Sequence, residues 1–335
     1  MPRPSTTPTE SAPPGSAPAE DAQADGAPAE VAQNELGRLL AEVQAQIKTD
    51  DPRLAEIVRS AVTHLHAFVR EVRPTEREWL AGLDFLARTG QACTDTRDEF
   101  ILLSDMLGLT SAVDEGNHAG PSEATPSSVE GPFHSPAPAR PPGAWLAEGP
   151  ERERGEQMVV HGRVGDCAGN PIHGATVDIW QADDAGHYDT QDPAQPPGNL
   201  RALLTTEADG LYWFRSVLPS SYPVPTDGPV GELLTALGRH PMRPAHIHLR
   251  VEAEGYRPVT THVFVAGDPY LDSDAAFAVK DALVVTPQPV DDPVAARQWA
   301  VEGPFLDFTF DVRLAALDDS DPAPEAEATS PEVAR

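Results

Sequence analysis

Two histidines that are separated by one residue stand in a segment typical of a β-strand. They are His246 and His248, within residues 245–251. Side chains at positions i and i+2 of a strand point to the same face of a sheet, so both imidazoles could reach one metal ion. Two ordinary hydrogen-bonded histidines would give the same pattern. The pair alone therefore leaves a metal site and a structural role open.

Two of the five tyrosines stand in predicted loops. Tyr188 ends a polar turn after the apolar run 176–180, and Tyr222 follows a Pro-Ser-Ser sequence. Each could be an amphipathic ring that packs on a sheet with its hydroxyl in water. With His246 and His248, they offer two phenolate oxygens and two nitrogens, a set that suits trivalent iron better than zinc or magnesium. A trivalent cation would also favour the ionised phenolate.

The elements that must position these side chains follow from the hydrophobic pattern. Apolar residues at helical spacing extend from about Glu35 to Leu109 and predict four or five helices, with a capping box at Thr75 and Glu78 and a helix end at Gly108. Short β-type runs are separated by Gly, Pro and Asp turns and predict a mostly antiparallel sandwich or barrel. These runs are residues 158–164, 176–180, 212–217, 246–251, 260–265 and 308–312.

The fold class expected from this order is α+β, with a helical unit followed by a β-sandwich. The predicted helical unit spans residues 36–112, a Pro/Gly-rich connector spans 113–156, and the β-sandwich spans 157–316. Residues 1–35 and 317–335 are rich in Pro, Ala, Ser and Glu without apolar periodicity, and such segments cannot bury enough surface to fold. We expect both to be disordered.

The charge balance narrows the classes of partner. The chain has 53 acidic against 24 basic residues, a formal charge of −29. Such acidity disfavours nucleic acid and anionic membrane surfaces as partners. A membrane helix needs about 18 consecutive apolar residues, and the sequence contains neither such a run nor a signal-peptide pattern. The sequence therefore predicts a cytoplasmic protein.

Several motifs in the same order as the candidate ligands point to a known family. They are Gly186-His187-Tyr188, Pro219-Ser220-Ser221-Tyr222, the run 238–248 that ends in the His-x-His pair, and the run 265–271. Over about residues 37–312 the chain resembles the intradiol ring-cleavage dioxygenases, which are non-haem Fe(III) enzymes that split catechols between the two hydroxyl-bearing carbons. The helical part resembles that of the dimeric members and is absent from the protocatechuate enzymes, so the resemblance implies a homodimer.

The resemblance also implies roles for individual residues. It implies that one Fe(III) ion per subunit is bound by Tyr188, Tyr222, His246 and His248. Tyr222 would also leave the metal and accept a proton, and Arg243 would stabilise negative charge on the substrate ring. His262 replaces a Gln of the catechol enzymes and would either orient the intermediate or pack beside the ligands. The substrate ring would lie against Leu102, Asp105, Gly131, Pro132, Phe133, Pro219, Arg243 and Ala276.

Three stretches resemble most closely the members that act on hydroxyquinol, namely residues 98–105, 222–231 and 270–274. Burial of the Asp105 carboxylate in a ring pocket would cost free energy unless a third substrate hydroxyl donates a hydrogen bond to it. We therefore expect O2-dependent cleavage of this small aromatic triol to 3-hydroxy-cis,cis-muconate or maleylacetate. The alternative is a catechol or chlorocatechol 1,2-dioxygenase, which would act on a diol. Two departures from the family pattern, Glu130 and Ala276, predict a wider and more polar pocket mouth.

Two other classes of protein would fit parts of the pattern. In a non-catalytic β-sandwich binding module, the tyrosines and histidines would only pack, and the purified protein would be colourless and free of iron. A zinc hydrolase would need a nucleophile or a carboxylate base beside the histidines, and none stands out in the sequence.

Overall fold

The computed structural model describes residues 26–94, 97–118 and 120–317. The chain divides into two compact units, with the boundary after Leu83. Apart from residues 26–35 and Leu317, the two predicted disordered segments lie outside the described residues. Helix α1 (Gly26–Ala45) begins within the range predicted as the leader. Among the described residues, every helix is too short or too polar to cross a membrane.

The first unit contains α1, α2 (Pro52–Val72) and the beginning of α3 (Glu76–Ala92). Asp51 caps α2 by accepting from two backbone N–H groups of its first turn. At the start of α3 the predicted capping box is confirmed: the Thr75 N–H donates to the Glu78 carboxylate at 2.8 Å, and the Glu78 N–H donates to the Thr75 hydroxyl at 3.3 Å. The sequence thus specifies where these helices begin.

Two further helices, α4 (Glu99–Met106) and α5 (Leu109–Asn117), belong to the second unit. Gly108, with φ at 71°, separates them as predicted. The described chain therefore has five helices up to Asn117, which confirms the predicted number. Helix α4 packs against α7 (Pro229–Ala236) in a cluster with the segment near Ala276. This packing places α4 and α5 in the second unit, and the predicted domain bounds stay a prediction.

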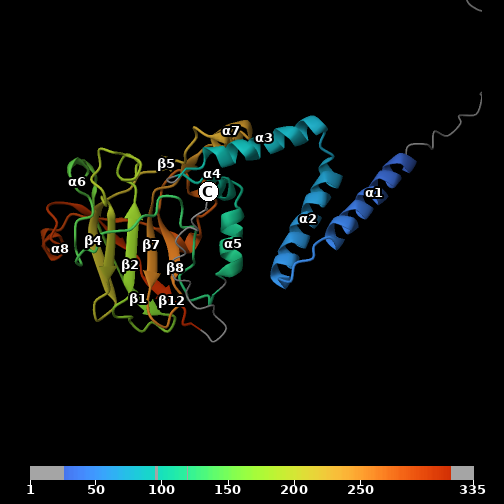
Figure 1. The fold of residues 1–335 in the computed structure, drawn as a ribbon. Helices are drawn as coiled ribbons and strands as arrows, with labels where there is room; N and C mark the ends of the chain where they lie inside the picture. Colours follow the sequence, from blue (N-terminus) through green and yellow to red (C-terminus); the bar gives the residue numbers. More distant parts are fainter. Residues whose placement is uncertain (1–25, 95–96, 119, 318–335) are drawn as a thin grey trace, which may run out of the picture. The chain divides into compact units, whose positions relative to one another are not determined.

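The second unit also contains two five-stranded sheets. The first has the order β10-β11-β1-β12, with β4 also paired to β1, and the second has the order β3-β2-β7-β8-β9 (Figure 1). Most pairs are antiparallel, as predicted, but β1 pairs in parallel with β11 and β12, and β8 pairs in parallel with β9.

The strand bounds are as follows: β1 (Gln157–Asp166), β2 (Thr176–Gln181), β3 (Arg201–Thr205), β4 (Leu211–Val217), β7 (His246–Glu252), β8 (Val259–Val265), β9 (Val284–Val285), β10 (Gln288–Val290), β11 (Phe305–Thr309) and β12 (Val312–Leu314). A separate two-stranded ribbon joins β5 (Tyr222–Pro223) to β6 (Met242–Arg243). Short helices are α6 (Pro150–Arg154) and α8 (Pro293–Gln298), and the 3-10 helices are η1 (Leu271–Ser273) and η2 (Asp281–Leu283).

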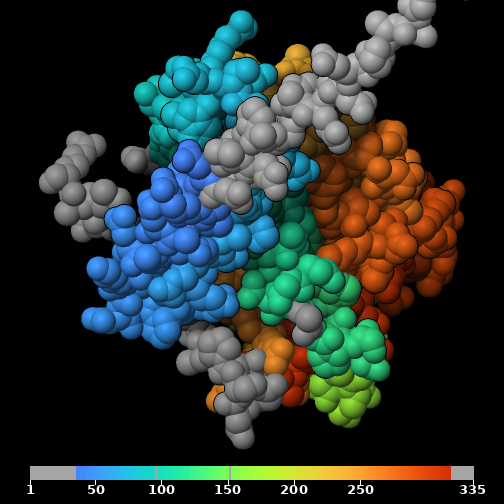
Figure 2. Space-filling view, turned by 90° about the vertical axis from the view of Figure 1, so that its right-hand side faces the viewer, coloured from blue at the N-terminus to red at the C-terminus, as the bar shows by residue number. Residues whose placement is uncertain are grey.

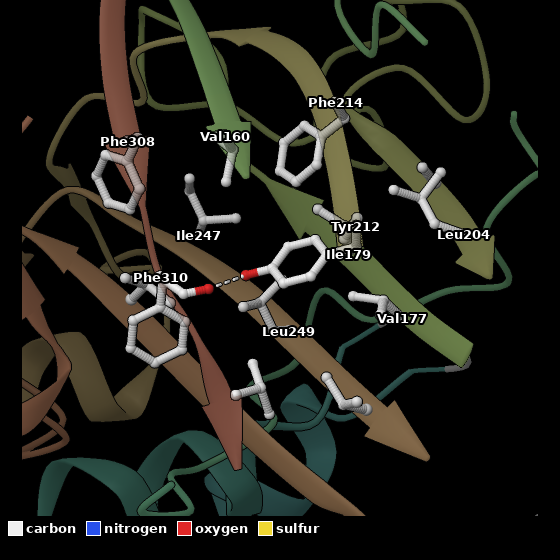
Figure 3. Close-up of a cluster of buried hydrophobic side chains, with 14 of the residues drawn as sticks. Val160, Val177, Ile179, Leu204, Tyr212, Phe214, Ile247, Leu249, Phe308 and Phe310 are labelled. Atoms are coloured by element: carbon white, nitrogen blue, oxygen red, sulfur yellow. Dashed lines mark hydrogen bonds between the residues drawn. The ribbon is translucent and has the colours of Figure 1, made fainter. Parts of the chain in front are cut away.

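The main core lies between the two sheets (Figure 3). Ile247 and Leu249 of β7 point into it, and the buried Tyr212 hydroxyl donates to the Phe310 carbonyl at 2.6 Å. Side chains alternate between the two faces of a strand. Because Ile247 and Leu249 occupy the core face of β7, His246 and His248 are directed to the opposite face. The hydrophobic pattern of one strand therefore places both histidines together.

Helix α5 is fastened to the chain that follows η1. The Ser111 hydroxyl donates to the Ala276 carbonyl at 3.2 Å, and Lys280 forms an ion pair with Asp114 at 3.3 Å. In Figure 2 the green surface around α5 borders the orange surface of the segment from about residue 270 to 290. These contacts hold α4 and α5 beside the face of the second sheet that carries the histidines.

Candidate active site

The four candidate ligands meet in a buried cluster. His246 Nε2 lies 3.1 Å from His248 Nε2, 3.4 Å from Tyr222 Oη and 3.5 Å from Tyr188 Oη. Tyr188 Oη lies 3.1 Å from His248 Nε2 and 3.3 Å from Tyr222 Oη. Ligand atoms that share one metal ion at about 2.0–2.2 Å are separated by distances of this size. The geometry therefore fits a single ion bound by two nitrogens and two oxygens.

The two tyrosine loops approach each other closely. In the Tyr188 loop, the Asp183 carboxylate accepts from the N–H groups of Ala185 and His187 at 3.0 and 2.8 Å. Gly186 has φ at 87°, and a Cβ atom there would lie 2.8 Å from Tyr222 Cβ. Only glycine fits this position, because it combines a left-handed backbone with a contact that leaves no room for a side chain.

A buried ion pair fixes the chain just after Tyr188. Asp189 accepts from Arg201 Nε at 2.8 Å, and both side chains are buried. Tyr222 is held by a different contact. It lies in β5, and it is paired with Arg243 of β6 across the two-stranded ribbon. The sequence places these two loops far apart, and the ion pair and the ribbon bring their phenol groups to one point.

The two candidate histidine ligands are oriented by different contacts. His246 Nδ1–H donates to the Pro244 carbonyl at 2.7 Å, so the lone pair of Nε2 points into the cluster. His248 Nδ1 is buried and has no hydrogen-bond partner among the described residues. The His248 ring instead stacks on Trp180, with the ring centroids 4.6 Å apart and the planes at 12°. Trp180 and His248 are direct partners in the pairing of β2 with β7.

His262 stands on β8 directly opposite His248, and their ring centroids are 4.2 Å apart. Its Nδ1 is 2.8 Å from the Ser128 hydroxyl, whereas its Nε2 is buried without a hydrogen-bond partner among the described residues. One ring nitrogen from each of His246, His248 and His262 lies within 4.8 Å of the others. The structure thus brings His262 to the cluster, and its role in the reaction stays a prediction.

Burial and the nearby Arg243 control the charge of the cluster. Burial, aided by Arg243, lowers the pKa of His246 to about 3, and burial also lowers the pKa of His248 and of His262. The imidazoles are therefore neutral at pH 7 and can donate lone pairs. Burial raises the pKa of Tyr188 and of Tyr222, and Arg243 opposes that rise at both phenols.

Arg243 is almost completely buried beside the cluster. Its guanidinium pairs with Asp274, with Nε 3.1 Å from Oδ1 and Nη2 3.4 Å from Oδ2. The family resemblance placed Arg243 near the substrate ring and assigned no role to Asp274, although Asp274 lies in a stretch that carried the resemblance. Their pairing depends on a turn that only the folded chain forms.

The predicted ring-binding residues lie in two groups. Phe133 stacks on Tyr188 with the ring centroids 4.7 Å apart, and a Cβ atom on Gly131 would lie 3.5 Å from His248 Cε1. Pro132 joins these two residues. Leu102 and Ala276 share the buried cluster formed by α4 and α7. These five residues therefore lie next to the candidate metal ligands or in the buried cluster of α4 and α7. Their contacts with a substrate remain predictions.

Asp105 and Pro219 complete the predicted pocket. Asp105 is 4% exposed, and its Oδ1 has no hydrogen-bond partner among the described residues. Pro219 is buried in the loop between β4 and β5. Its place against the ring stays a prediction.

Glu130, one of the two departures from the family pattern, is about half-exposed and lies 3.7 Å from His134 Nδ1. His134 Nε2 is 2.9 Å from the Asp178 carboxylate, and the His134 ring contacts the edge of Trp180. Sequence reasoning missed Trp180 and its neighbours. The strand alternation of the sequence could have indicated Trp180, because its side chain points to the face of β2 that is directed away from the core.

Comparison with known proteins agrees with this geometry. A family model described as Dioxygenase matches residues 129–316, and one described as Catechol dioxygenase N terminus matches residues 51–125. A hydroxyquinol 1,2-dioxygenase of Rhizobium sp. (strain MTP-10005) is 47% identical over 268 residues, which cover 77% of this chain and 90% of that protein.

Two further proteins are similar over most of their lengths. A 6-chlorohydroxyquinol 1,2-dioxygenase of Cupriavidus pinatubonensis is 48% identical over 237 residues, covering 70% of this chain and 85% of that protein. The solved structure of a hydroxyquinol 1,2-dioxygenase from Pseudomonas putida DLL-E4 is 40% identical, with a TM-score of 0.79 over 86% of this chain and 100% of that chain. With its buried cluster of histidines and tyrosines, the chain therefore belongs to the intradiol ring-cleavage dioxygenases, a family that implies a non-haem Fe(III) centre.

Proposed function

We propose that this chain cleaves hydroxyquinol (1,2,4-trihydroxybenzene) with O2 between its adjacent hydroxyl-bearing carbons. The proposed Fe(III) ion, one per chain, is held by Tyr188, Tyr222, His246 and His248. The observation that carries this proposal is the convergence of those four donor atoms, with each neighbouring pair within 3.5 Å. A bound ferric ion supplies a redox-active centre that draws electron density from a chelated ring and makes the ring reactive toward O2.

The protein side chains manage protons and charge in this reaction. Bound to the ferric ion, Tyr222 would be a phenolate, which can accept a proton from a substrate hydroxyl. Arg243 opposes the rise that burial causes in the pKa of Tyr222. The Arg243 guanidinium then stabilises the negative charge that develops on the ring, and its pairing with Asp274 keeps it in place. His262 orients the opening ring through its unpaired Nε2. Both atoms of O2 enter the product, 3-hydroxy-cis,cis-muconate or its keto form maleylacetate.

Asp105 supports hydroxyquinol rather than catechol as the substrate. Its buried Oδ1 lacks a hydrogen-bond donor within the described chain, and the third hydroxyl of hydroxyquinol supplies one. Catechol would leave this acceptor unpaired, at a cost of about 1–3 kcal/mol. The names of the two relatives above, which specify hydroxyquinol and its 6-chloro derivative, agree with this choice.

Substrate preference tests this assignment. We expect kcat/KM to be at least about tenfold higher for hydroxyquinol than for catechol, since about 1.4 kcal/mol corresponds to a factor of ten. Asp105→Ala should remove most of this preference, and the matched variant Ser104→Ala, one residue earlier in α4, should keep it. A wild-type preference for catechol or a chlorocatechol would overturn the substrate, and a chain that opens neither ring would overturn the activity.

We further propose a cytoplasmic homodimer. Large apolar side chains of α2 are exposed in the single chain, which is typical of a surface that contacts another protein. They are Leu54, Ile57, Leu65, Phe68 and Val72. Sedimentation equilibrium should give twice the mass of the chain, and Leu65→Glu should shift the protein toward the monomer.

A further inference from the structure

The buried Asp274 carboxylate is the centre of the turn that follows η1. It is 5% exposed and meets four donors. Besides Arg243, it accepts from the Ala276 N–H at 3.2 Å and from the Ala278 N–H at 3.0 Å. A carboxylate with two backbone donors and one guanidinium is fully used as an acceptor. Arg243, the two backbone groups and Asp274 thus form one rigid unit.

The conformation of the turn needs these contacts. Phe277, between the two residues that donate to Asp274, has φ at 55°. A bulky side chain in the left-handed region is strained and persists only where its surroundings hold it. The hydrogen bonds on either side of Phe277 provide that restraint. Without them, the turn can relax and carry Ala276 away from the cluster that it shares with Leu102.

The turn is also joined to the strand that carries Arg243. The Ala275 N–H donates to the Met242 carbonyl at 3.1 Å, so β6 and the turn are connected next to both members of the ion pair. A free arginine side chain has many rotamers, and it loses that conformational entropy when it is fixed. Asp274 fixes the guanidinium before a substrate binds, and preorganised charge of this kind is the most effective in catalysis.

We propose that Asp274 is a positioning residue of ring cleavage: its carboxylate holds the Arg243 guanidinium toward the substrate ring and keeps the turn 274–278 in the shape that supports Ala276. This inference rests on the ring cleavage proposed above. Asp274 itself contacts neither the metal cluster nor the ring. Its effect on the reaction passes through Arg243 and the turn.

The test is Asp274→Asn in the iron-loaded protein, with Asp272→Asn as the matched control. Asp272 lies in η1 and is exposed, so its variant should retain the wild-type kcat. Asp274→Asn should keep the wild-type ratio of iron to protein and lower kcat for hydroxyquinol at least tenfold, with KM changed less than threefold. A larger effect on kcat than on KM is expected when an interaction acts in the transition state.

A double-mutant cycle separates positioning from general destabilisation. In an Arg243→Lys background, Asp274→Asn should lower kcat less than twofold further, because the group through which it acts is already altered. If Asp274→Asn does not fold, Asp274→Glu keeps the charge, displaces the guanidinium and should still lower kcat at full iron content.

Three results would overturn the role of Asp274: a wild-type kcat in either Asp274 variant, a loss of activity that follows a loss of iron, or effects of Asp274→Asn and Arg243→Lys that multiply. A wild-type chain that opens no aromatic diol or triol would instead overturn the proposed function.

Discussion

At the scale of single residues, the two histidines of the proposed iron site differ in what orients them. His246 has the usual arrangement, in which the second ring nitrogen donates to a carbonyl. His248 Nδ1 has no such partner in the part of the chain that the structure describes, and its ring lies between those of Trp180 and His262. Ring stacking therefore replaces hydrogen bonding as the contact that directs the His248 lone pair.

This difference predicts an effect of Trp180 on metal binding. Loss of a group that orients a ligand typically weakens metal affinity about 10- to 100-fold. Trp180→Leu should show a loss in this range when iron affinity is measured by competition with a chelator, whereas Trp180→Phe, which retains an aromatic face, should lose less than threefold. Trp213→Leu, at a tryptophan packed against Trp299 outside the site, is the control. Equal affinities for Trp180→Leu and wild type would show that stacking does not orient His248.

Residues of the site could be predicted where their spacing or the family resemblance pointed to them, as for the His246–His248 pair and the two tyrosines. Trp180 and Asp274 were not predicted as contacts of the site. Trp180 meets His248 through the register of two strands far apart in sequence, and Asp274 meets Arg243 through a turn whose shape depends on the strained Phe277. Such contacts are properties of the folded chain rather than of local sequence.

At the scale of elements, the loop that carries Tyr188 depends on Gly186. Gly186→Ala adds both a left-handed strain and a contact at 2.8 Å with Tyr222 Cβ. The matched control is Gly174→Ala, because Gly174 has φ at 76° and no atom within 4 Å of an added Cβ. The control should lower the free energy of unfolding by about 1–2 kcal/mol from backbone strain alone.

Gly186→Ala should lose more stability than the control and should also bind iron more weakly, because the contact pushes the two tyrosine loops apart. Urea unfolding and iron content check both parts. If the two variants lose the same stability and both retain iron, the close approach at Gly186 does not organise the site.

Most of the longer strands were predicted, but β3 and β10 were missed, and the predicted strand 308–312 spans the break between β11 and β12. The apolar alternation of β1, β2, β4, β7 and β8 gave strands close to the observed bounds. Strands β5, β6 and β9 have two residues each, too few for a period to be recognised. The parallel pairing of β1 with β11 and β12 joins opposite ends of the sandwich sequence, and no local pattern encodes it.

At the scale of the whole molecule, burial of several neutral histidines makes stability depend on pH. The unfolded chain takes up a proton on each histidine near pH 6.5, while the folded chain holds the pKa of His246 at about 3. The unfolded state therefore binds more protons between these values, and the stability of the folded state is lost as the pH falls below about 6.5.

In the metal-free protein, His246 alone should lower the free energy of unfolding by about 2 kcal/mol between pH 7 and pH 5. Urea unfolding at the two pH values measures it. His246→Gln should remove part of the pH dependence, and His64→Gln, at an exposed position of α2, should leave it unchanged. A pH dependence that is the same in all three proteins would contradict a neutral buried histidine cluster.

The order of helical and β-rich parts was predictable from the hydrophobic pattern, and the predicted domain bounds stay a prediction. The sequence favoured a boundary near residue 112, where the helical pattern ends. The observed boundary after Leu83 reflects the burial of α4 against α7, a contact between segments more than 100 residues apart. That contact also brings Leu102 and Asp105 to the face of the sheet that carries the histidines.

In the proposed iron site, four side chains from separate parts of the chain bind one ferric ion. Anomalous diffraction at the iron absorption edge, from crystals of protein purified from iron-replete cells, tests it most directly. We expect red-brown crystals with one iron peak per chain, surrounded by Tyr188 Oη, Tyr222 Oη, His246 Nε2 and His248 Nε2. A peak elsewhere in the chain, or colourless crystals without an iron peak, would contradict it.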